Sequence, residues 1–494
     1  MKRNTQRLVI VANRLPVTVE QTGNRWQAKP SSGGLVTALT PLLRSRGGMW
    51  IGWPGTSDPK ANTEQLLSDY HDDTGFFLKP VPLSQNDVDR FYLGFSNEII
   101  WPLFHDFITP CNFDPSYWEA YRRVNRRFAD VIIHSLEPGD FLWVHDYHLM
   151  NVAHELRNRK VPNRIGFFLH TPFPSPDNFI KLPWRADVLR GLLQFDLVGF
   201  QTIRDHRKFL QCVRMLVDGV RIKTRGPLSD ITFGRRKLRV GSFPIGIDFH
   251  EFSRGAQEPS VIARSEKIHR ELPNRQIVLG VDRLDYTKGI PHRLRAFEEA
   301  LKKHPELQGH VTFVQVVVPS RQIIPQYRQL KTEIEQLVSR INGQFSQLGW
   351  VPIHYFYRNL NRAELLANYR VADVALVTPL KDGMNLVAKE YCACKSDLNG
   401  ALILSEFAGS AGQLQSGALL VNPFDIEGMG AAIHQAIIMS PEERRTRMRK
   451  LRRIVERDNI GRWVNDFLQA VIDRDLRHFP IRGPVPDYTP GISI

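Results

Sequence analysis

The fold is indicated by residues 373–390, which have the sequence DVALVTPLKDGMNLVAKE. Four apolar residues at 374–377 predict a buried strand, a Thr-Pro pair ends it, and a glycine-containing turn at 381–385 leads into a helix from Leu386. The N-terminus of a helix presents backbone N–H groups that attract anions. This order of strand, turn and helix is typical of an α/β unit with a ligand site, although many such turns bind nothing.

The residues of this turn suggest a sugar or phosphate ligand. Asp382 could accept hydrogen bonds from sugar hydroxyls, and Glu390, one helical turn further on, could accept them from a ribose. The backbone N–H groups expected to face the ligand belong to Gly383, Met384, Asn385, Leu386 and Val387.

Length and composition indicate a globular protein of two domains. The chain has 494 residues, which is too many for one ordinary core, and it is 42% hydrophobic and 24% charged. It contains no run of 18 apolar residues and no signal-peptide pattern at its start, which predicts a cytoplasmic protein. Its four cysteines fit a reducing compartment, and Cys392 and Cys394 lack partners at zinc spacing, so we interpret that pair as structural.

The net charge of +15 suits acidic ligands, which include nucleic acids and small phosphorylated molecules. Much of the excess charge lies in two arginine-rich runs, 122–127 and 444–457. Because no aromatic residues interleave these runs in a stacking pattern, we interpret them as solvated helix faces. Small acidic ligands are therefore favoured over nucleic acid, and no membrane partner is expected.

The first half of the chain begins with an apolar strand at 8–12, and Arg14 follows at its end. Ligands of open α/β sheets bind where strands end, and a guanidinium there can grip a phosphate, although it could also be a plain surface arginine. Gly33 and Gly34 lie in a small-residue loop that opens a predicted helix at 35–43. Such a loop lets the backbone approach a diphosphate, but this one is not a complete glycine-rich fingerprint.

Aromatic residues and strand-end polar residues supply further candidates. Tyr92 and Trp101 could form walls of a sugar pocket, although the aromatic residues of the segment 49–130 are more typical of a core. Asp146 and His170 follow two predicted strands directly. Polar residues at successive strand ends are expected to line one wall of a cleft.

A loop-like stretch near residue 250 predicts the domain boundary. We expect an N-terminal domain at 1–250, a C-terminal domain at 251–459, and a disordered tail at 480–494, where proline and glycine are frequent. The alternation of strands and helices in both halves predicts an α/β fold of two doubly wound, Rossmann-like domains facing each other across a cleft.

The second half supplies cations at its own strand ends. Arg283 and Lys288 lie on one exit loop and could hold a diphosphate from two sides, while Arg321 could join Arg14 in binding a second anion. The sequence shows no metal-ligand cluster, P-loop or nucleophile elbow, so cationic side chains should neutralise the leaving group. These features favour group transfer from a nucleotide diphosphate to a phosphorylated acceptor.

Six motifs, in this order, resemble those of the α,α-trehalose-phosphate synthases: NRLP (13–16), SGGL (32–35), HDYH (145–148), FLHTPFP (168–174), DRLDYTKG (282–289) and DGMNLVAKE (382–390). The resemblance extends over about residues 8–475. It implies a B-type glycosyltransferase fold and the synthesis of trehalose 6-phosphate from UDP-glucose and glucose 6-phosphate, with retention and without a metal or other cofactor. It also implies a helix at about 460–479 that returns to the first domain, and a homo-oligomer, either a dimer or a tetramer.

The resemblance further implies a role for each matching residue. Glucose 6-phosphate would be held by Arg14, Tyr92, Trp101, Asp146 and Arg321. UDP-glucose would be held by Gly33, Gly34, Arg283, Lys288, Leu360, Gly383, Met384, Asn385, Leu386, Val387, Ala388, Lys389 and Glu390. His170 and Asp382 would orient the transferred glucose, and Arg283 and Lys288 would also act in catalysis. Retention without a carboxylate nucleophile implies attack on the front face of the sugar, unlike the paired carboxylates of retaining hydrolases.

Two alternatives remain open beside this activity. The chain could be a sister transferase that uses another phosphorylated acceptor, such as glycerol 3-phosphate or a cyclitol phosphate. It could instead be a non-catalytic sensor of sugar phosphates, which would tolerate loss of Asp382, Arg283 or Lys288, but all three residues are present.

Overall fold

The computed structural model describes residues 7–23, 25–31, 34–69, 75–109, 111–321 and 323–472. Among these residues the chain forms two compact units, the first containing 7–243 and 464–472 and the second containing 244–463. The predicted tail at 480–494 and the last residues of the helix predicted at 460–479 lie outside the described residues.

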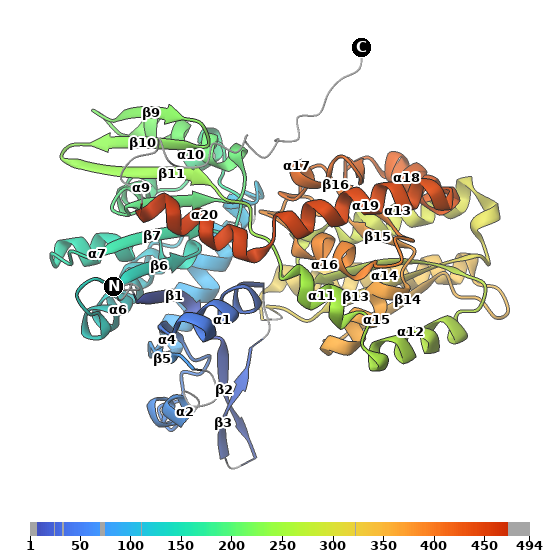
Figure 1. The fold of residues 1–494 in the computed structure, drawn as a ribbon, viewed down its shortest axis with the longest axis horizontal. Helices are drawn as coiled ribbons and strands as arrows, with labels where there is room; N and C mark the ends of the chain where they lie inside the picture. Colours follow the sequence, from blue (N-terminus) through green and yellow to red (C-terminus); the bar gives the residue numbers. More distant parts are fainter. Residues whose placement is uncertain are drawn as a thin grey trace, which may run out of the picture. The chain divides into compact units, whose positions relative to one another are not determined.

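The first unit contains a nine-stranded sheet in the order β5-β4-β1-β6-β7-β8-β11-β10-β9 (Figure 1). In this spatial order the first seven strands, β5 through β11, pair in parallel. The last two, β10 and β9, are added at the edge as antiparallel strands. The strands are β1 (Leu8–Arg14), β4 (Met49–Trp53), β5 (Phe77–Pro80), β6 (Phe141–His145), β7 (Arg164–Leu169), β8 (Leu197–Phe200), β9 (Arg221–Arg225), β10 (Leu228–Phe233) and β11 (Arg236–Ser242), with a separate hairpin of β2 (Val17–Thr22) and β3 (Arg25–Pro30).

The helices of the first unit are α1 (Gly34–Arg46), α2 (Thr63–Asp69), α4 (Gln85–Asp87), η1 (Val88–Ile100), α5 (Trp101–Phe104), α6 (Pro115–Ser135), η2 (Tyr147–Leu149), α7 (Val152–Asn158), α8 (Pro176–Phe179), α9 (Arg185–Leu192) and α10 (Ile203–Leu216). The last described helix, α20 (Ile460–Ile472), starts in the second unit and ends in the first. Its Phe467 ring stacks on Trp143 of β6 at 4.5 Å between centroids. Gly166 and Gly199 make room for this ring, because a Cβ on either glycine would lie within 3 Å of it.

The second unit contains a six-stranded parallel sheet in the order β14-β13-β12-β15-β16-β17. The strands are β12 (Gln276–Arg283), β13 (Val311–Val318), β14 (Ile353–Tyr357), β15 (Val374–Val377), β16 (Ala401–Ser405) and β17 (Leu419–Val421). The helices are α11 (Phe249–Gly255), α12 (Pro259–Glu271), η3 (Tyr286–Lys288), α13 (Ile290–Lys303), η4 (Pro305–Leu307), α14 (Pro325–Phe345), α15 (Arg362–Val371), α16 (Leu386–Cys394), α17 (Ala411–Leu414), α18 (Ile426–Ile438) and α19 (Pro441–Arg457).

The central parallel strands, among them β1, β6, β7 and β8 in the first unit and β12, β13, β15 and β16 in the second, are mostly apolar and buried, as expected for sheets with helices on both faces. In the second unit, α11, α12, α15, α16 and α19 share one buried cluster with the sheet, while α13 packs with α14 and α18 (Figure 1). The predicted α/β class with doubly wound, Rossmann-like parallel sheets is therefore confirmed. No helix in the described ranges is long and apolar enough to cross a membrane.

The two units divide at Phe243 and Pro244, a few residues before the boundary predicted at 250. The reason lies in packing: Ile247 and Phe249 are 5% exposed and belong to the buried cluster of the second unit. The backbone N–H of Ile460 also donates to the Ile247 carbonyl at 3.0 Å. The loop-like segment after Phe243 is therefore part of the second core.

The interpretation of the arginine-rich runs as solvated faces holds for exposed residues such as Arg122 and Arg126 but is wrong for Arg444. Arg444 is 4% exposed and donates to the carbonyls of Ala436 and Ile437 at the C-terminal end of α18, where the helix dipole favours a cation. On α6, Arg123 and Arg127 pair with one buried carboxylate, Asp87, at 2.9 and 2.7 Å. Part of the excess positive charge therefore stabilises the fold.

Candidate functional site

The turn after β15 has the local geometry that residues 373–390 predict. Asn385 lies at φ 71° and caps α16, with its side chain accepting from the N–H of Ala388 at 3.4 Å. The segment after β16 holds the turn, because Gly409 N–H donates to the Asp382 carbonyl at 3.0 Å. A Cβ on Gly409 would lie only 1.8 Å from the Gly383 oxygen, so the close approach requires glycine. The N-terminus of α16, where backbone N–H groups have no partner within the helix, is thus held in a fixed position.

Lys288 lies beside this turn and contacts its carboxylate. The Lys288 Nζ is 2.5 Å from Asp382 Oδ2, and the Asn385 amide donates to the same oxygen at 3.1 Å. The side chains of Lys288 and Asp382 are 12% and 14% exposed. Lys288 ends η3 and is followed by Gly289 at φ 65°, where a Cβ would lie 2.5 Å from the Thr378 carbonyl oxygen. The two sequence motifs at 282–289 and 382–390 therefore meet in one site.

Three of the predicted phosphate-binding cations surround one buried carboxylate, Asp285. Arg321 Nη1 lies 3.4 Å from Asp285 Oδ2 and donates to the Tyr327 hydroxyl at 2.6 Å. Burial alone would raise the pKa of Asp285, but Arg321, Arg283 and Lys288 lower it overall. Asp285 therefore stays ionised and draws the three cations together. Arg283 itself is exposed at the end of β12.

This cluster places Arg321, which is predicted to bind the acceptor phosphate, beside the same carboxylate as two residues predicted to bind the donor. Arg321 has φ 45°, an uncommon conformation for a residue other than glycine, so its backbone is held by its surroundings. The signal that could have found this grouping is the Asp285 carboxylate within the DRLDYTKG motif. Its side chain is buried and draws the cations together.

A second buried ion pair, which the sequence reasoning missed, lies in the second unit under these residues. Arg293 of α13 is fully buried and its Nη1 lies 2.7 Å from Asp282 Oδ2. It also donates to Thr378 Oγ1 at 3.1 Å and to the Lys288 carbonyl at 3.3 Å. A single guanidinium thus joins β12, η3 and the end of β15. Gly280 is required beside it, because a Cβ there would lie 2.6 Å from Arg293 Nη1.

The remaining predicted donor residues differ in what their side chains do. Glu390 Oε2 accepts from the Tyr369 hydroxyl at 2.8 Å, and burial raises its pKa. The Lys389 ammonium is buried and donates to the Ile245 carbonyl and to Gln413 Oε1 at 2.6 and 2.7 Å. Burial lowers its pKa to about 7, against the opposing charge of Asp458. The Lys389 side chain is therefore committed to the core of the second unit, and a donor contact would have to come from its backbone.

The other predicted donor-binding residues of the second unit are apolar or glycine. Leu360 lies between β14 and α15 and packs on the core. Gly383, Met384 and Ala388 are buried, and Leu386 and Val387 are partly buried at the start of α16. Gly34 is the first residue of α1 in the first unit, and Gly33 lies outside the described residues.

In the first unit, Arg14 lies at the end of β1, where the sequence pattern predicts a strand mouth. Its guanidinium carbon is 3.9 Å from the centre of the Trp53 ring and 5.7 Å from that of Tyr92. The Arg14 side chain remains exposed. The close contact with the Trp53 ring fixes the plane of the guanidinium, a group whose N–H edges suit an anion.

The aromatic residues near Arg14 form a continuous group. Tyr92 of η1 stacks on His148 with 6.0 Å between centroids and 14° between planes, and His148 stacks on Tyr147 at 4.0 Å. Trp101 lies 5.8 Å from Tyr147 and is 7% exposed. Trp101 is therefore mostly a core residue, while the partly buried Tyr92 retains an accessible face.

Asp146 and His170, at the ends of β6 and β7, meet directly. Asp146 lies at φ 73°, and its Oδ1 accepts from the backbone N–H of His170 at 3.2 Å. The two ring nitrogens of His170 lie 3.2 Å from His145 Nδ1 and 3.4 Å from the Gln201 amide. Burial lowers the pKa of His170 to about 3, so the ring is neutral near pH 7. His145 and Gln201, which the sequence reasoning missed, hold this neutral ring in place.

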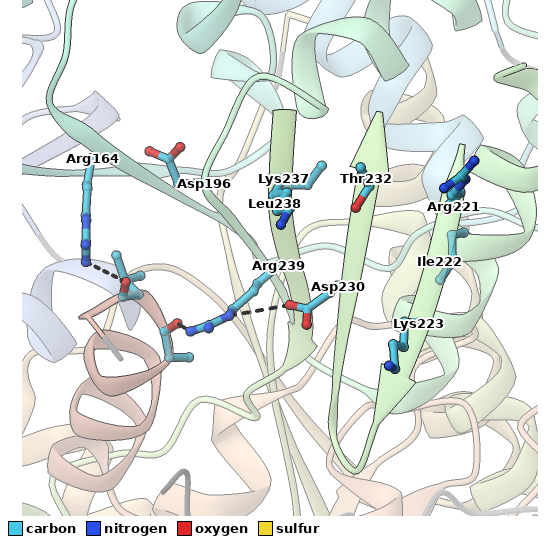
Figure 2. A pocket seen from close by; sticks show the side chains of 12 residues that line it. Arg164, Asp196, Arg221, Ile222, Lys223, Asp230, Thr232, Lys237, Leu238 and Arg239 are labelled. Atoms are coloured by element: carbon cyan, nitrogen blue, oxygen red, sulfur yellow. Dashed lines mark hydrogen bonds and ion pairs between the residues drawn. The ribbon is translucent and has the colours of Figure 1, made fainter. Parts of the chain in front are cut away.

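A basic cavity of about 630 Å³ lies elsewhere in the first unit, between β9–β11 and the end of α20 (Figure 2). Arg164 and Arg239 donate to the carbonyls of Val471 and Ala470 at 2.9 and 2.8 Å. The lining residues are Arg164, Asp196, Arg221, Ile222, Lys223, Asp230, Thr232, Lys237, Leu238, Arg239, Ala470 and Val471. None of the residues predicted to bind substrate lines this cavity. We therefore do not assign the cavity as the substrate site, despite its volume.

Metal-ligand side chains converge at one place in the described part of the chain, formed by His304, Glu306 and His434. This group lies at the end of α13 opposite Lys288. A helix of 14 residues is about 21 Å long, so the group is far from the turn at Asp382.

Comparison with known proteins agrees with this geometry. The family model for glycosyltransferase family 20 matches residues 6–473. A trehalose-6-phosphate synthase of Mycolicibacterium gilvum is 45% identical over 479 residues, covering 94% of each chain. Among solved structures, an α,α-trehalose-phosphate synthase (UDP-forming) of Burkholderia xenovorans in complex with glucose-6-phosphate has a TM-score of 0.85 and 34% identity, covering 94% of this chain and all of the other. An Escherichia coli structure bound with UDP-2-fluoro glucose has a TM-score of 0.85 and 36% identity, covering 94% and 99%. The chain therefore belongs to glycosyltransferase family 20, the family of the trehalose-phosphate synthases.

Proposed function

We propose that this trehalose-phosphate synthase moves glucose from UDP-glucose to glucose 6-phosphate with retention and without a metal ion, releasing UDP. The observation that supports the donor assignment best is the position of Arg283 and Lys288 around Asp285, beside the N-terminus of α16. Arg321, on the same carboxylate, would bind the acceptor phosphate. A diphosphate leaving group gains negative charge as its bond to glucose breaks. Fixed cations and helix N–H groups stabilise that charge, which is the role that a metal ion has in other transferases.

The acceptor phosphate would bind to Arg14 in the first unit. Stacking on Trp53 orients the guanidinium, whose paired N–H groups match a phosphate. Tyr92 would cover one face of the acceptor sugar, and Trp101 would support that wall from the core. Asp146, fixed by the His170 N–H, would accept a hydrogen bond from an acceptor hydroxyl.

Retention by double displacement requires a free carboxylate at the reacting carbon. Asp382 is the carboxylate of the turn, and it is engaged by Lys288 and Asn385, which weakens it as a nucleophile. We therefore favour a front-face reaction. The bond between glucose C1 and the donor phosphate oxygen breaks, that oxygen takes the proton of the acceptor hydroxyl, and the acceptor oxygen bonds to C1 on the same face.

His170 would then act as a neutral hydrogen-bonding group that orients the transferred glucose, because a ring with a pKa of about 3 cannot act as a cation near pH 7. Asp382 would have the same orienting role in the second unit. The homo-oligomer and the cytoplasmic location expected from the sequence remain predictions. Light scattering of the purified chain would measure the first.

The decisive experiment is a matrix of donors and acceptors with identification of the product. UDP-, ADP- and GDP-glucose are each combined with glucose 6-phosphate, glycerol 3-phosphate and a cyclitol phosphate, with and without EDTA. We expect UDP release that depends on glucose 6-phosphate and is unaffected by EDTA, with an α,α linkage by NMR. Preference for another acceptor would support a sister transferase, a β linkage at the donor carbon would exclude retention, and loss of turnover in EDTA that added metal restores would exclude the metal-free reaction.

A further inference from the structure

The second unit contains three metal-ligand side chains that the proposed reaction does not use. His304 and Glu306 flank the start of η4, directly after α13, and His434 lies on α18. The His304 Nδ1 and His434 Nε2 atoms lie 3.3 and 3.1 Å from the same oxygen, Glu306 Oε1. All three ligand atoms lie within 4.8 Å of one another.

These separations suit a zinc ion. Zinc binds imidazole nitrogen and carboxylate oxygen at about 2.0–2.2 Å, so two ligands of a tetrahedral ion are about 3.4 Å apart. Both nitrogen-to-oxygen distances here are close to that value. Two histidines with one carboxylate are a donor set that suits zinc and similar transition metals, whereas magnesium prefers oxygen ligands alone.

The two imidazole rings also face each other. Their centroids are 3.6 Å apart and their planes differ by 5°. Parallel rings cannot both aim a lone pair at one ion, so binding requires one ring to rotate about its Cβ–Cγ bond. The side chains of His304 and His434 are 27% and 22% exposed, and that of Glu306 is 59% exposed. Such partial exposure allows the rotation and gives an ion access from solvent.

The backbone under this group is close-packed and joins two helices. A Cβ on Gly430 would lie 3.2 Å from the Ala296 carbonyl oxygen, which shows how closely α18 approaches α13. Lys303 pairs with Glu427 at 2.8 Å across the same two helices. The backbone positions of the ligand residues are therefore fixed by the fold before an ion binds, and only a side-chain rotation is needed.

We propose that His304, Glu306 and His434 bind one zinc ion, with water at the remaining position, and that this ion fastens the end of α13 to α18. The site lies at the end of α13 away from Lys288, so its role is stabilisation of the second unit and not sugar transfer. The proposal does not depend on the activity proposed above, since its ligands are separate from those residues.

The test is a titration of the full chain, without a polyhistidine tag and stripped with EDTA, with ZnCl2 by isothermal calorimetry. We expect one zinc per chain, no binding of MgCl2, and a rise in the melting temperature on adding zinc. Glu306→Gln and His434→Gln should each weaken binding at least about tenfold, because each removes one of three protein ligands. His269→Gln, an exposed histidine of α12, is the matched control and should bind zinc as the wild type does.

The exposed position of Glu306 makes Glu306→Gln safe for folding, and turnover of UDP-glucose should be unchanged in it. CoCl2 should give visible absorption bands in the wild type that Glu306→Gln and His434→Gln lose. The proposal is overturned if zinc shows no saturable site of one ion per chain up to about 100 μM, which corresponds to an affinity near −5.5 kcal/mol. It is also overturned if Glu306→Gln or His434→Gln binds zinc as tightly as the wild type.

Discussion

Replacing Arg293 by methionine should destabilise the second unit more than any exposed charge change on the same helix. Methionine fills most of the same volume but leaves Asp282 buried without its partner. It also removes donors to Thr378 and to the Lys288 carbonyl. Removing one member of a buried ion pair costs about 3–5 kcal/mol, because the remaining charge is desolvated and unpaired.

The control is Arg295→Met, two residues further along α13. Arg295 pairs with Glu333 at 2.7 Å, but the two side chains are 40% and 43% exposed. Exposed ion pairs contribute roughly 0–1 kcal/mol to stability. Arg293→Met should therefore lower the free energy of unfolding several times more than Arg295→Met. The double variant Asp282→Asn with Arg293→Met removes the unpaired charge and should recover part of the loss.

The assay is hydrogen exchange of peptides from β12 and α13, which reports the free energy of unfolding of the second unit by itself. Burial already raises the pKa of Asp282 against the opposing effect of Arg293. Without Arg293 the pKa of Asp282 in the folded chain rises further. The Arg293→Met variant therefore shows the full loss of unfolding free energy only above that pKa, where Asp282 is ionised. The part of the cost that comes from the unpaired Asp282 charge disappears as the pH falls towards the unfolded value of about 3.9. The reasoning is refuted if Arg293→Met costs no more than Arg295→Met at pH 7.

Three further predictions follow from the candidate site. Lys288→Ala removes a cation beside the donor turn and should lower kcat/KM for UDP-glucose by about 10²–10³, with the fold intact by circular dichroism; an unchanged rate would remove Lys288 from catalysis. Gly409→Ala places a Cβ 1.8 Å from the Gly383 oxygen and should abolish most turnover, whereas Gly343→Ala in α14 meets nothing within 4 Å and should leave it unchanged. Lys389 has a pKa of about 7 in the folded chain, below its unfolded value of about 10.4, so the unfolded chain binds the extra proton between these values. Wild-type stability relative to Lys389→Met should therefore rise from pH 7 to 10 in urea titrations, by at most about 1.4 kcal/mol per pH unit, and a flat difference would contradict the pKa.

Much of the site could be predicted because its residues belong to local patterns. The turn after β15 depends on the order of an apolar strand, a glycine and a helix start within 373–390, and no distant residue is needed to expect it. Arg283 and Lys288 lie five positions apart on one loop, so their proximity also follows from the sequence. Arg14, Asp146 and His170 could be predicted because each directly follows an apolar strand pattern, which is also a local signal.

Groupings that depend on side chains from distant segments could not be predicted. Nothing local links Arg321 to Asp285, and nothing local links Arg444 of α19 to the carbonyls of α18 that bury it. Lys389 belongs to the DGMNLVAKE motif by position, yet its side chain turns into the core to reach Ile245 and Gln413.

The sequence by itself determined the doubly wound α/β architecture, the order of its motifs and the positively charged strand ends, because periodicity and turn chemistry act over a few residues. Only the tertiary structure decided which charges are buried, paired or exposed, and which histidines meet across helices. Burial and pairing depend on groups brought together by packing, and the same lysine or histidine has a different charge state once water is removed from around it.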